Sequence, residues 1–245
     1  MIKNWYLTLV LLLFCSNLLL AQTPPAWGGG ADQNDLSFGF LFSYVSSNYK
    51  IVKQPNWRAP YFDQGTNKYI TDSLRSISSN SLPGFAIGFI TRYTLMEHLE
   101  VRITPALVFS DRSLTYTYDD PALNVTKQIQ PTSVDLPLLL KLKSDRLGNF
   151  RAYVLAGVKY SYAISKGAGD ENTLDPLQKL VRNTGGFGSY ETGIGCDIYF
   201  EFFKLSPEIK LSNSFGNVLV PENQPFSAPI SKLSLHTIMF SLYFE

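Results

Sequence analysis

The stretch YETGIGCDIYF, residues 190–200, alternates between two kinds of side chain. Every second residue from Tyr190 is apolar apart from a threonine, whereas the positions between them hold glutamate, glycine and aspartate before Tyr199. A period of two residues is typical of a β-strand whose faces meet different surroundings. Its length matches the roughly 9–11 residues that a tilted strand needs to cross the hydrocarbon layer of a membrane.

The same alternation recurs along the chain and predicts eight strands. No Asp, Glu, Lys or Arg occurs on the apolar face of any of these stretches, whereas the opposite face is charged. Large apolar side chains on one face of many successive strands favour a lipid-facing wall over a soluble sandwich. The predicted strands cover residues 36–44, 85–95, 101–109, 134–142, 152–162, 190–200, 203–211 and 238–244.

The connections between the predicted strands alternate between short and long. Turns follow the second, fourth and sixth strands, and long connections (48–82, 111–132, 163–185 and 213–229) follow the first, third, fifth and seventh. Outer-membrane barrels have this arrangement, with short periplasmic turns and longer external loops. The sequence therefore predicts an all-β, eight-stranded, antiparallel, up-and-down transmembrane barrel over residues 35–245, with both termini periplasmic.

The first 34 residues have the features of a leader and a linker. Residues 1–21 are interpreted as a signal peptide, because Lys3 precedes a long apolar run and Ala21-Gln22 offers a cleavage point. An uncleaved anchor helix and a lipoprotein site at Cys15 are the alternatives. Residues 22–34, rich in proline and glycine, are interpreted as a flexible periplasmic lead-in.

Composition agrees with a membrane barrel. Charged residues make up 17% of the chain, against roughly 25% in average soluble domains. Aromatic residues make up 14%, and these residues collect in strands and at membrane interfaces. A formal net charge of +1 gives no reason to expect nucleic acid as a partner. Outer-membrane lipid is the expected surrounding.

The charged faces of the predicted strands would line a barrel just wide enough to be filled by its own side chains. We expect ion pairs there, such as Arg92 or Arg102 with Glu100, Asp135 or Glu191, because an unpaired buried charge is costly. Such a lattice could plug the barrel or form a gated polar path. The predicted interior charges are Arg92, Glu100, Arg102, Asp135, Lys141, Arg151, Lys159, Glu191, Asp197, Lys204, Glu208 and Lys210.

The sequence gives little sign of catalysis. His98 and His236 are the only histidines, and no clustered His or Cys residues suggest a metal site. An outer-membrane lipid hydrolase using His236 with Ser234 remains an alternative, because triads assemble from distant residues. Cys196 is expected on the lipid face. We expect no enzyme activity, no cofactor and no small-molecule substrate.

The last strand is ambiguous. Continued upward, its lipid-facing set would include His236 and Lys232, whereas Leu233 and Leu235 lie in the other phase. Either a bulge near Thr237 or a Lys232 above the membrane would resolve this. The final residues Tyr243 and Phe244 resemble an aromatic signal that the barrel-assembly machinery recognises.

The long connections are the expected working surface if the interior is filled. The first mixes aromatic with basic side chains, which suits contact with a protein or a loop that folds over the barrel mouth. Within it, Asp72-Ser73-Leu74 resembles a short O-glycosylation motif of Bacteroidota, so Ser73 is a candidate for modification.

Several stretches together resemble the PorT (SprT) proteins of Bacteroidota. The resemblance spans essentially the whole chain after the leader, and the order and spacing of the stretches carry it. They are residues 27–32 (WGGGAD), 82–89 (LPGFAIGF), 97–99 (EHL), 135–141 (DLPLLLK), 149–151 (NFR), 205–210 (LSPEIK) and 237–240 (TIMF).

This resemblance implies an outer-membrane barrel required by the type IX secretion system and by gliding motility. It implies no catalytic residues, and it suggests other secretion components as partners. Because a filled barrel cannot pass a polypeptide, we expect an accessory or assembly role rather than a translocating pore. The alternative is a general OmpX-like or adhesin-type barrel unconnected with secretion.

Overall fold

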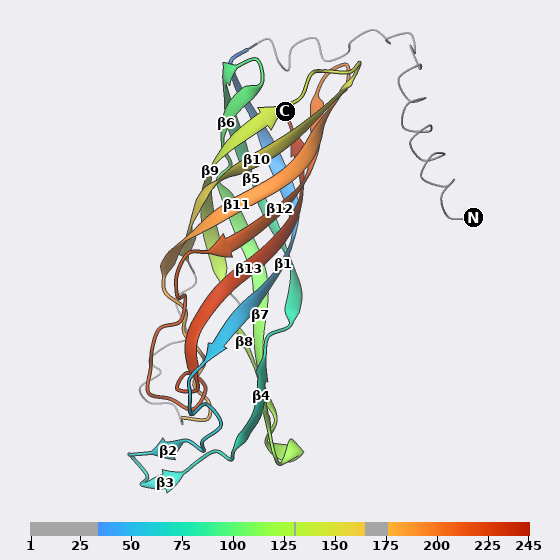
Figure 1. The fold of residues 1–245 in the computed structure, drawn as a ribbon. Coiled ribbons are helices and arrows are strands. Elements are labelled where there is room, and N and C mark those ends of the chain that lie inside the picture. Colours follow the sequence, from blue (N-terminus) through green and yellow to red (C-terminus); the bar gives the residue numbers. More distant parts are fainter. Residues whose placement is uncertain (1–33, 130, 165–175) are drawn as a thin grey trace, which may run out of the picture.

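The structure is a computed structural model that describes residues 34–129, 131–164 and 176–245. Its long strands are antiparallel and close into an eight-strand ring, because β1 pairs with both β5 and β13 (Figure 1). The predicted eight-stranded barrel is therefore confirmed. The ring consists of β1 (Leu36–Lys53), β5 (Ser81–Met96), β6 (Leu99–Ile103) continued by β7 (Ala106–Tyr118), β9 (Thr132–Lys143), β10 (Phe150–Ala163), β11 (Gly186–Tyr199), β12 (Lys204–Ser214) and β13 (Ile230–Phe244).

One ring strand is interrupted at Thr104-Pro105, which separates β6 from β7. Proline has no N–H to donate to a neighbouring strand. Its carbonyl is nevertheless used, since Phe89 N donates to Pro105 O over 3.0 Å. Both β6 and β7 pair with β5 on one side and β9 on the other, so the wall continues across the break.

The outward faces of the ring strands form a continuous apolar belt. In water so large an exposed apolar surface would cause aggregation, whereas lipid is a matching solvent for it. The inward faces of the same strands carry the charges. The belt includes Phe38, Phe40, Phe42, Tyr44, Phe89, Leu136, Leu138, Leu140, Val154, Val158, Tyr160, Tyr190, Ile194, Ile209 and Phe240.

The belt ends before the strands do. Along β1 the outward positions after Tyr44 are polar, namely Ser46, Asn48 and Lys50. The outward side chains of β7 beyond Phe109 and of β13 beyond Ile238 also change from apolar to polar. Outward tyrosines lie near this boundary, as expected for a membrane interface. The strands therefore continue past the membrane into water at the end that carries the long connections.

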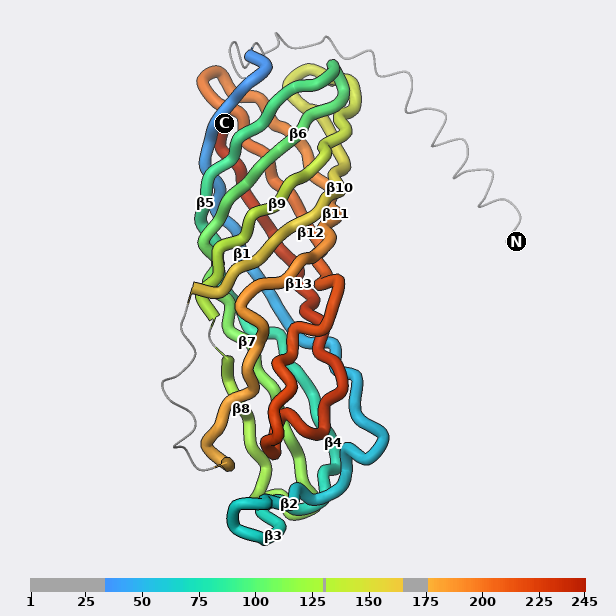
Figure 2. Tube along the Cα trace, turned by 90° about the vertical axis from the view of Figure 1, so that its left-hand side faces the viewer, coloured from blue at the N-terminus to red at the C-terminus, as the bar shows by residue number. Residues whose placement is uncertain are grey.

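The first and second long connections are shorter and more ordered than the sequence predicted. Residues assigned to loops 48–82 and 111–132 form parts of β1, β5 and β7 and five further short elements. β4 and β8 pair with opposite edges of β7 and extend the sheet beyond the ring (Figure 2). The short elements are β2 (Phe62–Asp63), β3 (Lys68–Tyr69), β4 (Leu74–Ser78), the 3-10 helix η2 (Pro121–Leu123) and β8 (Val125–Ile129).

The last strand has no bulge near Thr237. Its register with β1 is unbroken from Phe244 to Lys232, and the only shift lies at Val52/Lys53. The Thr237 side chain is buried and lies 3.0 Å from the Ser47 hydroxyl. Lys232 therefore lies beyond the apolar belt, which was the second of the two sequence-based alternatives.

Some predictions concern residues outside the described part of the chain. The proposed signal peptide, with Ala21 and Gln22, and residues 22–33 of the lead-in lie outside the described residues. Within the described residues, no helix has the length and apolarity needed to cross a membrane.

A charge placed on the belt tests its contact with lipid. We expect Leu140→Arg to destabilise the barrel by about 2–4 kcal/mol, as for a basic residue near the bilayer midplane. Val52→Arg is the matched control, since Val52 is also aliphatic and 50% exposed against 53% for Leu140, but lies beyond the belt. Urea unfolding in phospholipid vesicles measures both changes. Equal losses would contradict the placement of the membrane.

Candidate functional site

The interior at the short-turn end holds the first layer of ion pairs. Arg92 donates to Glu245 over 2.6 Å and to Glu100 over 3.2 Å. Glu100 also accepts from Lys143, and Lys204 lies 3.2 Å from Glu245. Lys143 and Glu245 were absent from the predicted set, because they lie where their strands end and periodicity is weakest there.

The middle layer combines ions with two tyrosines. Arg102 donates to Glu208 over 2.8 Å, and the Tyr153 hydroxyl donates to the same carboxylate over 2.9 Å. Lys210 donates to the Tyr243 hydroxyl over 2.9 Å, and the guanidinium of Arg102 lies 4.3 Å from the Tyr243 ring. All of these side chains are buried, so each charge depends on its neighbours rather than on water.

The remaining predicted charges complete the lattice. Lys159 lies 3.0 Å from Asp135 and 2.9 Å from Glu191, and Lys141 lies 2.8 Å from Asp197. Of the pairings named from the sequence, Arg92 meets Glu100, whereas Arg102 meets Glu208 instead.

Arg151 differs from the other predicted interior charges because it lies at the barrel rim. It donates to the backbone oxygens of Ser144 over 2.6 Å and of Glu97 over 3.0 Å. It therefore ties two of the short turns together.

The free space among the buried side chains in the middle of the barrel is small. A cavity of about 10 Å³ lies among Val45, Ser110, Asp135, Lys159 and Thr237. This volume is at the lower limit for one water molecule. The geometry therefore favours a structural plug over a gated path for solutes.

Tyr243 and Phe244, the predicted assembly signal, point to opposite sides of the wall. Tyr243 is fully buried in the middle ionic layer. Phe244 faces lipid and stacks on Phe40 with ring centroids 5.0 Å apart. Both residues thus help to hold β13 against its neighbours, and their recognition by assembly machinery stays a prediction.

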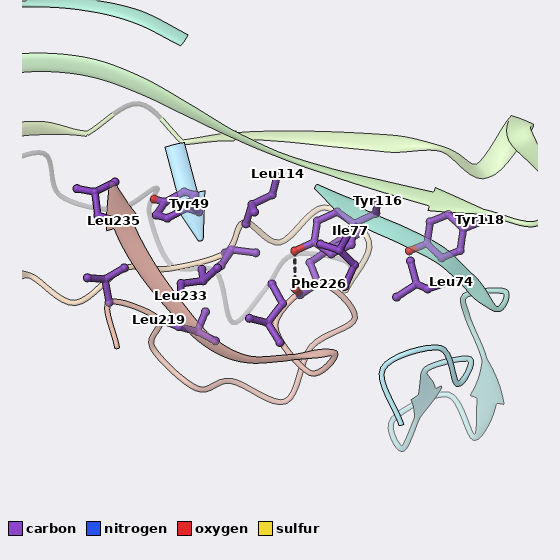
Figure 3. Packing of buried hydrophobic residues seen from close by; sticks show 13 residues of the cluster. Tyr49, Leu74, Ile77, Leu114, Tyr116, Tyr118, Leu219, Phe226, Leu233 and Leu235 are labelled. Carbon is purple, nitrogen blue, oxygen red and sulfur yellow. Dashed lines mark hydrogen bonds between the residues drawn. The ribbon is translucent and has the colours of Figure 1, made fainter. Parts of the chain in front are cut away.

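Beyond the belt, the interior changes from ionic to apolar. A hydrophobic cluster, here called the cap core, fills the water-exposed end of the barrel (Figure 3). It unites the extended ring strands with the third and fourth long connections. Its buried members are Tyr49, Leu74, Ile77, Leu114, Tyr116, Tyr118, Val181, Val218, Leu219, Phe226, Ile230, Leu233 and Leu235.

Phe226 is the anchor of the fourth connection in the cap core. Its ring packs edge-on against Tyr116 with centroids 5.1 Å apart, and the Tyr116 hydroxyl donates to Phe226 O over 2.6 Å. Burial raises the pKa of Tyr116, which keeps the phenol protonated as a donor. The Lys127 ammonium lies 4.4 Å from the Phe226 centroid, and burial lowers the pKa of Lys127.

The part of the molecule beyond the belt that surrounds the cap core is here called the cap. Side chains in the cap also form hydrogen bonds with its backbone. Asn217 Oδ1 accepts from Leu219 N over 3.0 Å and from Leu233 N over 2.9 Å. Gln224 donates to Leu180 O over 3.0 Å, which joins the fourth connection to the third. The cap is therefore a folded unit and not a set of separate loops.

The histidines do not form a catalytic arrangement. His236 Nδ1 lies 2.7 Å from the amide oxygen of Asn213, where a triad would place a carboxylate. His98 lies in a short turn, 3.6 Å from Asp145. Among the described residues, no group of three or more His, Cys, Asp or Glu is placed to hold a metal ion.

Removing the anchor tests whether the cap is folded. We expect Phe226→Ala to lose about 3–5 kcal/mol of local packing and to expose the fourth connection to proteases. Phe215→Ala is the control, because Phe215 is 60% exposed in the same connection. Limited proteolysis of intact vesicles measures both. Equal cleavage of the two variants would contradict a packed cap.

The belt, the filled interior and the folded cap define a closed β-barrel of the outer-membrane class. The chain belongs to the family described as outer membrane protein beta-barrel domain, whose profile matches residues 21–220. A search of curated proteins found no matching sequence.

Solved structures of small outer-membrane proteins are similar to this chain. OprG from Pseudomonas aeruginosa shares 13% identity over 91% of this chain and 96% of its own, with a TM-score of 0.45. Neisserial surface protein A shares 9% over 86% and 98%, with a TM-score of 0.40. Ail from Yersinia pestis shares 12% over 86% and 99%, with a TM-score of 0.34.

Proposed function

We propose that this barrel is a non-catalytic accessory or assembly component of the type IX secretion system. It would dock other secretion components in the outer membrane, with the short turns and both termini on the periplasmic side and the cap outside. The observation that carries a docking role rather than a transport role is the filled interior. The cavity among the buried side chains in the middle of the barrel is only about 10 Å³, and a barrel of eight strands is just wide enough to be filled by its own side chains.

The cap supports docking in a second way. Binding to a rigid surface avoids the entropic cost of ordering loops. The four long connections share one apolar core, and Gln224 of the fourth donates to Leu180 O of the third. This arrangement suits a preformed contact surface.

The assignment to type IX secretion rests on the resemblance of the sequence stretches to PorT proteins. An OmpX-like or adhesin-type barrel is the alternative, and a folded external cap is compatible with it. Export of cargo separates the two, because an adhesin is not needed for secretion.

The test is a deletion of the gene in its host, with type IX cargo measured in the medium and at the cell surface. We expect cargo to accumulate inside the deletion strain and gliding to stop, and the wild-type gene to restore both. Permeability of the outer membrane to a large antibiotic controls for general damage. Unchanged export in a strain that lacks the protein would contradict the proposal and favour the alternative.

A further inference from the structure

The cap carries a pocket of about 310 Å³, which is lined by residues of all four long connections. Binding residues lie disproportionately on loops, and an apolar pocket with a few polar groups is a candidate binding site. The first connection supplies three residues, the second five, and the third and fourth one each. The lining residues are Ile70, Thr71, Asp72, Tyr118, Ala122, Leu123, Asn124, Val125, Leu177 and Phe226.

The walls of this pocket are held in place before any ligand binds. Asp120 accepts from Ala122 N over 2.9 Å and so caps η2, and Asn124 Oδ1 accepts from Tyr118 N over 2.9 Å. Lys127 donates to the backbone oxygen of the lining residue Leu177 over 2.7 Å. Because Phe226 is fixed by Tyr116, both sides of the pocket are preorganised.

The lining is mainly hydrocarbon and is incompletely covered. Leu123 is 48% exposed and Leu177 is 44% exposed, on a part of the molecule that lies beyond the belt and faces water. Burial of such side chains on binding stabilises a complex by roughly 25 cal/mol per Å² of apolar area. The pocket therefore favours a bulky apolar group.

Carboxylates lie beside the mouth of the pocket: Asp72 is one of its lining residues, and Asp119 and Asp120 stand in the chain between the lining residues Tyr118 and Ala122. Asp72, Asp119 and Asp120 are exposed, and Asp119 N donates to Ser73 O over 3.4 Å, which brings the two segments together. Within the described part of the chain, no ion pair joins any of these carboxylates to a cation. Lys127, which contacts the lining residues Leu177 and Phe226, is directed to the Leu177 carbonyl and the Phe226 ring.

From this combination we infer that the pocket binds a polypeptide segment that carries an aromatic side chain flanked by lysine or arginine. The aromatic group enters the hydrocarbon-lined hole, and the basic neighbours meet the carboxylates at the mouth. Aromatic anchors in preformed pockets commonly dominate the energetics of protein contacts. The inference rests on the proposed docking role and specifies the chemistry of the partner.

The test uses the full barrel in nanodiscs of zwitterionic lipid, which do not attract basic peptides. The probe is the blocked peptide Lys-Lys-Trp-Lys-Lys with a fluorinated tryptophan, observed by fluorine NMR. We expect saturable broadening of its signal. Unlabelled competitors with alanine in place of tryptophan, or glutamate in place of lysine, should compete at least tenfold more weakly.

Two variants of the barrel test whether the peptide binds in the pocket. Ala122→Trp fills the hole and should weaken binding at least tenfold. The double variant Asp72→Asn/Asp119→Asn keeps the hole and should weaken binding severalfold, with a reduced dependence on salt. Tyr69→Ala is the control, because Tyr69 is 69% exposed in β3 and is not part of the lining. It should bind as the wild type does.

Binding that survives Ala122→Trp, or that is equal for the glutamate peptide, would overturn the inference. Preferential binding of lipid or detergent in the pocket would also overturn it. Because purified protein is used, the result is independent of cargo export. Peptide binding with unchanged export in the deletion strain would refute the secretion role alone, whereas lost export without peptide binding would refute only the pocket.

Discussion

Replacing Glu208 by leucine is expected to destabilise the barrel by about 3–5 kcal/mol, the usual cost of leaving a buried charge without its partner. Arg102 has no exposed surface and donates to Glu208 over 2.8 Å. Its remaining guanidinium edge faces the Tyr243 and Tyr153 rings, which cannot neutralise a full charge. Urea unfolding in phospholipid vesicles measures the loss.

The double variant Arg102→Leu/Glu208→Leu tests whether the loss comes from the broken ion pair. Replacing both members of a buried pair by apolar side chains is often nearly neutral. We therefore expect the double variant to be clearly more stable than Glu208→Leu alone. The single variant Arg102→Leu completes the comparison. If the loss of the double variant equals the sum of the losses of Arg102→Leu and Glu208→Leu, the two residues do not interact and the ionic lattice is not as described.

Gly157→Val should prevent the barrel from closing. A Cβ added at Gly157 would lie 2.1 Å from Leu138 O and 2.8 Å from Leu139 Cα, which are backbone atoms of the adjacent strand. Neither atom can move without separating β9 from β10. We expect a cost at or above the roughly 3 kcal/mol upper range of core overpacking, seen as loss of the heat-modifiable folded band on gels.

Ala156→Val controls for the general effect of a β-branched residue. Ala156 is the preceding residue and is exposed on the lipid side of the same strand. This variant should fold like the wild type, because valine suits both strands and lipid. A folded Gly157→Val barrel would show that the strands do not approach as closely as the structure has them.

The faces of the barrel could be predicted from the sequence because a strand has a strict period of two. In residues 190–200, the same alternation that puts Ile194 in the belt puts Glu191 and Asp197 in the interior. The partners of those charges could not be predicted. Lys159 meets Asp135 and Glu191 only because the registers of β9 and β11 against β10 bring them together.

The folded cap could not be predicted from the sequence either. Leu233 and Leu235 stood out as apolar residues in the inward phase, and they signal that the strand continues past the membrane with its faces reversed. Period alone cannot show what covers them. Phe226 joins Tyr116 across 110 positions in the sequence, and such contacts depend on how the long connections fold. The pocket on the cap was therefore beyond reach from the sequence.

Electrical recording from planar bilayers tests most directly whether the barrel is closed. Purified protein would be reconstituted after its fold is verified by heat-modifiable mobility, and a known porin would serve as a positive control. We predict no stable conductance steps at moderate voltage, because ion pairs and the cap core fill the interior from end to end. Long-lived, reproducible channel openings from the folded protein would contradict the account.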